Sequence, residues 1–266
     1  MSIDAHYPLT TTQIEFFQEH GFVKLKQVLA PSELEFFGRE LTRLTFELNT
    51  QTKPLEERST YDKAFLQVWN LWELSEIARQ FVFSKRLARI ATELLRVAGV
   101  RLYHDQALYK EAYGGMTPAH CDQYYWPLSN ADTVTVWVPL QAVPLEMGPL
   151  AFYSGSHRLS LGRDLEISDQ SESNIRAHME KLAIPLHEEP FDLGEVSFHR
   201  GWTFHRASAN STSRLRAAMT VIYMERNMKL VQPLNGHQRQ DWEKWCPGAE
   251  VGKVIDTPRN PVLYPA

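Results

Sequence analysis

The period of the hydrophobic residues changes near Val100, and this change limits what the chain can fold into. Before this point, apolar residues recur at helical steps, as Leu34, Phe37 and Leu41 do. After it, short segments rich in β-branched and aromatic residues alternate between apolar and polar positions, with Gly, Pro, Asn and Ser between them. These segments are 100–110, 133–140, 149–153, 194–199 and 214–224. The pattern predicts an α+β fold, in which a double-stranded β-helix (a jelly roll or cupin-like barrel) follows packed N-terminal helices.

We expect a single domain over residues 1–266. The predicted parts are a mainly helical support (1–99), a barrel core (100–225) and a C-terminal extension (226–266). Helices are expected from Thr10 or Thr12 to Gly21, over 31–48 and around 87–95, with a strand at 22–26 and a surface loop at 50–60. The charged, weakly helical segment 158–185 interrupts the strands and is predicted to lie over one end of the barrel, as a lid.

Composition and charge exclude several classes of function. The formal net charge of -4 leaves no excess of positive charge for binding nucleic acid. No apolar run reaches the length of a membrane span, and the first residues lack the pattern of a signal peptide. Two cysteines far apart, Cys121 and Cys246, predict reduced thiols. We therefore expect a cytoplasmic protein that acts on a small molecule.

A metal site is suggested by His120-x-Asp122. On a strand, residues i and i+2 point to the same side, so both side chains could reach one ion. A His and a carboxylate at this spacing, with a distant second His, can form the facial triad of non-haem iron(II) oxygenases. The pair alone is a weak signal, because His178-x-Glu180 and His187-x-Glu189 share the spacing. The first of these is expected on a helix, where i and i+2 do not face each other.

A second cluster lies downstream. His205 is predicted to end a strand before an Asn/Ser/Thr turn, and Arg216 follows on the returning strand. A buried arginine in an apolar strand needs an anion, and its planar fork suits a carboxylate. An internal ion pair is the alternative for Arg216, and Arg214 competes for the anion-binding role. His199 is a rival to His205 as the third ligand.

Taken together, these segments resemble the phytanoyl-CoA dioxygenase family. The resemblance covers nearly the whole chain and is most detailed in ALYKEAYGGMTPAHCDQYYWPL, DTVTVWVPL, GPLAFYSGSH and HRASANSTSRLRAA. It implies Fe(II) as cofactor, with 2-oxoglutarate and O2 as cosubstrates. Carried over position by position, the iron ligands are His120, Asp122 and His205. The residues implied in binding 2-oxoglutarate are Arg216, Gln106 and Trp137.

The resemblance implies hydroxylation of an unactivated C–H bond in a small organic or lipophilic metabolite, with release of succinate and CO2. Family members that halogenate lack the carboxylate that Asp122 provides here. Desaturation, epimerisation and cyclisation by the same oxidant stay open, as do a Zn or Mn cupin-like isomerase or hydrolase and a non-catalytic 2-oxoglutarate-binding protein. The candidate substrate contacts are Tyr124, Tyr125, Trp126 and Trp202, each of which could instead be packing.

Overall fold

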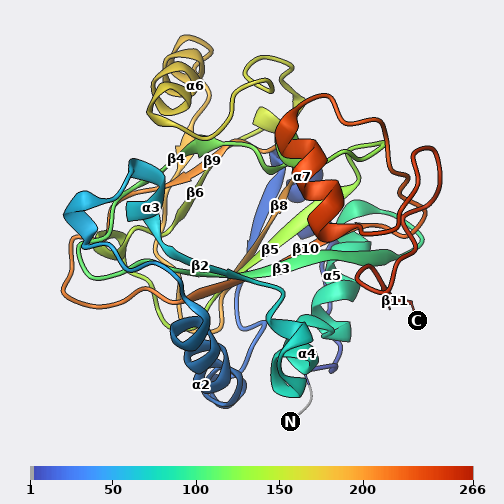
Figure 1. Cartoon of the computed structure of the whole chain (residues 1–266), viewed down its shortest axis with the longest axis horizontal. Helices are drawn as coiled ribbons and strands as arrows, with labels where there is room; N and C mark the ends of the chain where they lie inside the picture. The colour runs from blue at the N-terminus through green and yellow to red at the C-terminus, as the bar shows by residue number, and fades with distance from the viewer. Residues whose placement is uncertain (1–2, 266) are drawn as a thin grey trace.

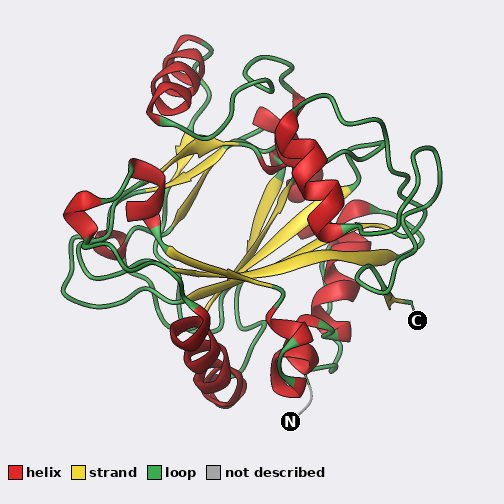
Figure 2. Cartoon of the chain, in the orientation of Figure 1, coloured by secondary structure: helices red, strands yellow, loops and turns green. Residues whose placement is uncertain are grey.

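Two antiparallel sheets face each other, and helices cover the outer face of the larger one (Figures 1 and 2). This computed structural model describes residues 3–265. The larger sheet has the order β1-β8-β5-β10-β3-β11, with β2 also paired to β3, and the smaller has the order β4-β9-β6-β7. The larger sheet consists of β1 (Phe22–Leu25), β2 (Leu66–Trp69), β3 (Val100–Tyr109), β5 (Thr133–Pro139), β8 (Val196–Arg200), β10 (Ala218–Glu225) and β11 (Val262–Tyr264). The smaller sheet consists of β4 (Thr117–His120), β6 (Leu150–Tyr153), β7 (Leu186–His187) and β9 (His205–Ala207).

Seven α-helices surround the sheets in the described part of the chain. They are α1 (Thr11–His20), α2 (Pro31–Leu48), α3 (Thr60–Ala64), α4 (Glu76–Val82), α5 (Lys85–Leu95), α6 (Asp169–Lys181) and α7 (Gly236–Trp245). Short 3-10 helices are η1 (Leu55–Glu57), η2 (Leu71–Glu73), η3 (Asp122–Tyr125), η4 (Leu145–Met147) and η5 (Ser156–Arg158). None of the described helices is long and apolar enough to cross a membrane.

The first helix shows how local sequence sets an element's ends. The Thr10 side chain accepts from the Gln13 backbone N–H and the Gln13 side chain accepts from the Thr10 N–H, so the predicted capping box is present. Gly21 ends the helix with φ of 79°, in the left-handed region. A Cβ at Gly21 would also lie 2.3 Å from His157 Nδ1, so both conformation and space require glycine there.

The alternation along β5 separates a helix-facing core from an inner cavity. Val134, Val136 and Val138 join the hydrophobic cluster under the N-terminal helices, whereas Thr135 and Trp137 line a cavity on the other face. Both faces of β5 are therefore buried. One face packs apolar side chains against the core, and the other presents side chains that can contact a ligand in the cavity.

Several details differ from the predictions. The mainly helical region 1–99 contains β2, which no expected segment covers, and the expected loop at 50–60 contains η1 and the start of α3. The returning strand begins at Ala218, so Arg216 precedes it in a single bridge with Lys110. The C-terminal extension adds α7 and the sheet strand β11. The segments of β2, α7 and β11 mix charged and aromatic residues, so their hydrophobic residues show no clear helical or strand periodicity from which these elements could be predicted.

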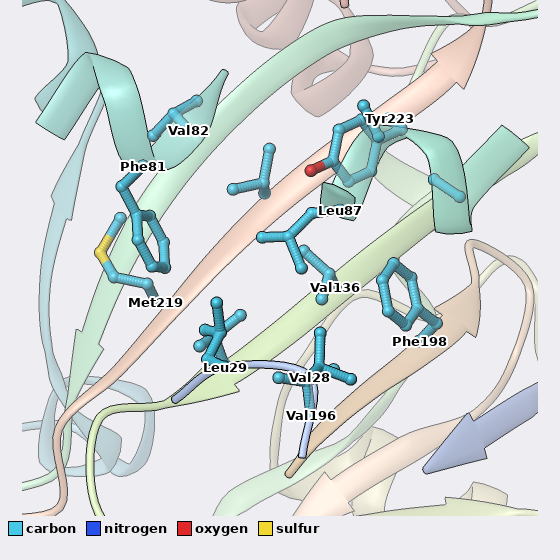
Figure 3. Close-up of a cluster of buried hydrophobic side chains, with 14 of the residues drawn as sticks. Val28, Leu29, Phe81, Val82, Leu87, Val136, Val196, Phe198, Met219 and Tyr223 are labelled. Carbon is cyan, nitrogen blue, oxygen red and sulfur yellow. The ribbon is translucent and has the colours of Figure 1, made fainter. Parts of the chain in front are cut away.

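The core between the helices and the larger sheet is apolar, as Figure 3 shows with Phe81 of α4 beside strands of the sheet. Phe81 is fully buried. We expect Phe81→Ala to lower the free energy of unfolding by about 3–5 kcal/mol through lost transfer energy and a residual cavity. Chemical denaturation measures this change. A loss below 1 kcal/mol would contradict the packing described here.

Candidate active site

Three potential metal ligands meet where the smaller sheet lines the inner cavity. His120 ends β4 and His205 begins β9, and these two residues are cross-strand partners. Asp122 follows as the first residue of η3. One ligand atom from each of the three lies within 4.8 Å of the others.

Strand pairing, rather than alternation along one strand, brings these groups together. The prediction that His120 and Asp122 share a strand face is wrong, because β4 stops at His120. His205 was also expected at the end of a strand but lies at the start of one. The decoy His178-x-Glu180 lies on α6, as expected.

Both imidazoles are oriented by backbone carbonyls. His120 Nδ1 lies 2.7 Å from the Pro118 carbonyl oxygen, and His205 Nδ1 lies 3.0 Å from that of Thr203. Since a carbonyl only accepts, each Nδ1 carries the proton and each Nε2 is left as a lone-pair donor. Burial lowers the pKa of both histidines to about 4, which keeps them in the neutral form that binds metal.

The two oxygens of Asp122 have different surroundings. Oδ1 lies 3.7 Å from His120 Nε2 and 3.6 Å from His205 Nε2, so it faces the potential metal position. Oδ2 accepts from Thr135 Oγ1 at 2.9 Å and lies 3.2 Å from His199 Nε2. Burial raises the pKa of Asp122, but the neighbouring His205 and His199 outweigh it, and the net shift is downward. His199, the rival third ligand, therefore contacts the outer oxygen of the carboxylate.

We expect the Thr135 hydroxyl to support metal binding through Asp122. Thr135→Val removes the donor to Oδ2 with little change in shape, and should weaken Fe(II) or Mn(II) binding by about tenfold. Thr135→Ser should restore it. Calorimetric metal titration measures the effect, with Thr220→Val as the matched control, because Thr220 also lines the cavity but hydrogen-bonds the Gln106 carbonyl instead. Equal affinities for Thr135→Val and wild type would contradict this role.

A buried, unpaired arginine lies in the same cavity. Arg216 is 2% exposed, and its Nη1 donates to the Gly148 carbonyl at 2.8 Å. Its Nε is buried without a partner, and its guanidinium carbon lies 5.3 Å from the centre of the Trp137 ring. Burial lowers its pKa to about 10. Among residues 3–265 no carboxylate forms an ion pair with Arg216, which removes the internal ion-pair alternative, and Arg214 is exposed.

Lys110 is a second buried cation, to which the sequence pattern assigned no role. Its backbone N–H donates to the Arg216 carbonyl at 2.9 Å, and the reverse bond is 2.8 Å. The side chain is fully buried, and its Nζ donates to the Gly115 carbonyl. Burial and the charge of Arg216 hold its pKa well below the usual value. A charged residue at the end of a predicted strand was the signal available in the sequence.

The cavity has a volume of about 580 Å³ and contains both the three ligands and Arg216. Gln106 and Trp137 line it, as do Tyr125 and Trp126 among the candidate substrate contacts. Gln106 accepts from the Gln67 side chain at 2.6 Å, so it is held by a neighbouring strand.

The other two candidate substrate contacts are not among the residues that line this cavity. Trp202 packs beneath Arg163, whose guanidinium carbon lies 4.4 Å from the ring centre. Tyr124 lies partly buried beside His237, with ring centres 6.0 Å apart. In this structure Trp202 and Tyr124 therefore lie outside the cavity wall.

The insertion 158–185 supplies part of the cavity wall through Glu166 and Ile167. The Ile167 N–H donates to the Tyr125 hydroxyl at 2.8 Å, and Glu166 Oε2 lies 2.8 Å from His237 Nε2 of α7. Farther along, Glu172 of α6 accepts from the Ala119 N–H at 2.7 Å, directly before His120. The insertion is thus anchored to α7 through Glu166 and to the metal motif through Ile167 and Glu172.

Helix α7 forms much of the remaining wall, and sequence reasoning missed it. His237, Gln240, Asp241, Lys244 and Trp245 all line the cavity. Their spacing of three or four residues places them on one face of the helix. This periodicity was the available signal, but it is carried by polar residues rather than by an apolar stripe.

Comparison with known sequences identifies one enzyme family. The family model described as "Phytanoyl-CoA dioxygenase (PhyH)" matches residues 17–218. The ectoine dioxygenase of Streptomyces anulatus is 26% identical over 162 residues, covering 58% of this chain and 54% of that protein. The peroxisomal phytanoyl-CoA dioxygenase of Homo sapiens is 21% identical over 266 residues, covering 89% of this chain and 74% of that protein. The chain spans about half the length of the ectoine dioxygenases it matches.

Solved structures share the fold. The non-haem α-ketoglutarate-dependent carbocyclase SnoK from nogalamycin biosynthesis has a TM-score of 0.77 and 23% identity, covering 98% of both chains. The epimerase SnoN, solved with Fe3+, α-ketoglutarate and nogalamycin RO, has a TM-score of 0.79 and 24% identity, covering 95% of this chain and 97% of that one. The family model covers well over half of the sequence, and the chain therefore belongs, as its motifs predicted, to the phytanoyl-CoA dioxygenase family.

Proposed function

We propose that this protein is a non-haem Fe(II)- and 2-oxoglutarate-dependent dioxygenase that hydroxylates an unactivated C–H bond of a small organic metabolite. The observation that carries the proposal is one cavity holding His120, Asp122 and His205 together with the unpaired, buried Arg216. Three protein ligands leave coordination positions open for a chelating 2-oxo acid and for O2. The buried guanidinium supplies the receptor for a second carboxylate.

The residues fit iron and its cosubstrate on their own chemistry. Two neutral imidazoles and one carboxylate leave a divalent iron with a net positive charge, which attracts the dianion 2-oxoglutarate. Arg216 would bind the distal carboxylate through its free Nε and the guanidinium N–H groups not used by the Gly148 and Leu108 carbonyls, and the Trp137 ring beside it restricts its position. When bound, the iron and its cosubstrates supply the oxidant, and 2-oxoglutarate is converted to succinate and CO2.

The carboxylate of Asp122 favours hydroxylation over halogenation, because it fills the position at which a halide would bind. Solved relatives named as an epimerase and a carbocyclase share the fold, so product analysis must distinguish hydroxylation from epimerisation and ring closure. A Zn or Mn cupin-like hydrolase gives no reason for a buried arginine without a carboxylate partner.

We also infer that the two sheets form the double-stranded β-helix, and that the chain is one domain. The facing antiparallel sheets support the first inference (Figure 2). The second is supported by β1 and β11, which come from opposite ends of the chain and belong to the same sheet.

Succinate formation tests the proposed function. Protein loaded with Fe(II) and supplied with 2-oxoglutarate and O2 should release succinate slowly without substrate, and faster when a substrate is found. Asp122→Ala should release none above the level of free iron. Tight binding of 2-oxoglutarate with no succinate under any condition would instead support the non-catalytic binding protein.

A further inference from the structure

One acidic residue in the cavity is hydrogen-bonded but has no ion-pair partner among the described residues. Three acids line the cavity, namely Asp122, Glu166 and Asp241. Asp122 belongs to the metal site, and Glu166 pairs with His237 at 2.8 Å. Asp241 accepts from the Tyr103 hydroxyl at 3.3 Å, and among residues 3–265 no cation lies within ion-pair distance of it. Its carboxylate therefore lies in the cavity wall without a direct ion pair.

The surroundings of Asp241 make an isolated negative charge costly. Burial raises its pKa to about 7, although the hydrogen bonds from the Tyr103 and Trp245 side chains and the charge of Lys244 act in the opposite direction. Tyr103 itself is 1% exposed and belongs to an aromatic cluster with Trp126 and Trp245. A bound cation would stabilise the ionised carboxylate at this end of the cavity.

Aromatic faces beside Asp241 already hold a cation. The rings of Trp69 and Trp245 lie 6.3 Å apart, one from β2 and the other from α7. Lys244 Nζ lies 3.7 Å from the centre of the Trp69 ring and 4.4 Å from that of Trp245. These distances are within the range of cation–π attraction, so the site attracts an ammonium group.

Lys244 is not a fixed part of this arrangement. Its residue is exposed and it makes no ion pair with Asp241 in the described structure. An exposed cation–π contact contributes only about 0.5–1 kcal/mol. A ligand that satisfies both the indole faces and the carboxylate can therefore displace the Lys244 ammonium into solvent.

We propose that Asp241, Trp69 and Trp245 form a substrate subsite for a protonated amine, and that the Lys244 side chain leaves when the amine binds. The proposal rests on the proposed function, because it places the rest of the substrate across the cavity towards His120 and His205. A neutral hydroxyl would satisfy one hydrogen bond but would leave the carboxylate charge uncompensated. The substrate class is thus a small amine with an apolar or aromatic body.

Benzylamine and benzyl alcohol form a matched pair of probes that differ in charge. We expect benzylamine to bind the protein loaded with Fe(II) and 2-oxoglutarate at least about tenfold more tightly than benzyl alcohol, as measured by anaerobic calorimetry. Asp241→Asn should abolish this preference, whereas Lys244→Ala should tighten amine binding. If Asp241 and Lys244 only stabilised the fold, both variants would be expected to weaken amine binding rather than change it in opposite directions. Glu166→Gln, which removes the acid already paired with His237, is the matched control and should keep the preference.

Equal binding of the two probes, or an unchanged preference in Asp241→Asn, would overturn the amine subsite. The titrations are repeated with protein lacking iron, so that the amine preference is measured independently of metal binding. Amine preference without any iron–2-oxoglutarate absorption band would overturn the proposed function and leave the subsite standing. A band without amine preference would overturn the subsite alone.

Discussion

Arg216→Ala is expected to weaken 2-oxoglutarate binding by at least about 30-fold, because losing one partner of a buried charge pair costs about 2–5 kcal/mol. Arg216 is 2% exposed and has no competing carboxylate among the described residues, so its interaction with an anion would be little screened. Calorimetric titration of the Mn(II)-loaded protein with 2-oxoglutarate under anaerobic conditions measures the loss. Arg216→Lys should recover only part of the affinity, since lysine keeps the charge but not the planar fork.

Arg214→Ala provides the matched control for Arg216. It removes the same kind of side chain two residues away, but from an exposed position. We expect its 2-oxoglutarate affinity to equal that of the wild type. If Arg214→Ala weakened binding as much as Arg216→Ala, the assignment of the distal carboxylate to Arg216 would be wrong.

Loss of a metal ligand is expected to have the second large effect. Asp122→Ala and His205→Ala should each weaken Fe(II) binding by more than about 100-fold, since mutations of groups that merely support ligands already cost 10–100-fold. The Asp122 variant removes the only negatively charged member of the cluster, and the His205 variant removes the Nε2 that lies 3.6 Å from Asp122 Oδ1. Competition with a chromophoric chelator measures both affinities.

His6→Ala is the control for these variants, because His6 is exposed and far along the chain from the cluster. It should bind Fe(II) as the wild type does. Wild-type affinity in His205→Ala, with loss in His199→Ala, would instead make His199 the third ligand. The hydrogen-bond distance of 3.2 Å from His199 Nε2 to Asp122 Oδ2 argues for a supporting role.

Sequence reasoning predicted the layout of the strands because their alternation is strong. The expected segments at 100–110 and 133–140 correspond to Val100–Tyr109 and Thr133–Pro139. The family was also predictable, since its motifs occur in the right order. The geometry that brings His120 and Asp122 together was not predictable, because the end of β4 depends on pairing with β9 rather than on the local sequence pattern.

The wall formed by α7 shows the other limit of sequence reasoning. Its cavity-facing residues are mostly polar, and a polar face of a helix normally indicates solvent. Only the tertiary structure places Asp241 and Lys244 over the same cavity as Asp122. The same holds for Lys110, whose burial beside Arg216 follows from the strand bridge and not from its neighbours in sequence.

The most direct test of the Fe(II) and 2-oxoglutarate site is the visible absorption spectrum of the purified apo-protein under anaerobic conditions. We predict a weak metal-to-ligand charge-transfer band that needs both Fe(II) and 2-oxoglutarate, is lost in His205→Ala and is weakened in Arg216→Ala. No band in the wild type at saturating Fe(II) and 2-oxoglutarate would contradict the account and would favour a Zn(II) or Mn(II) enzyme on the same fold.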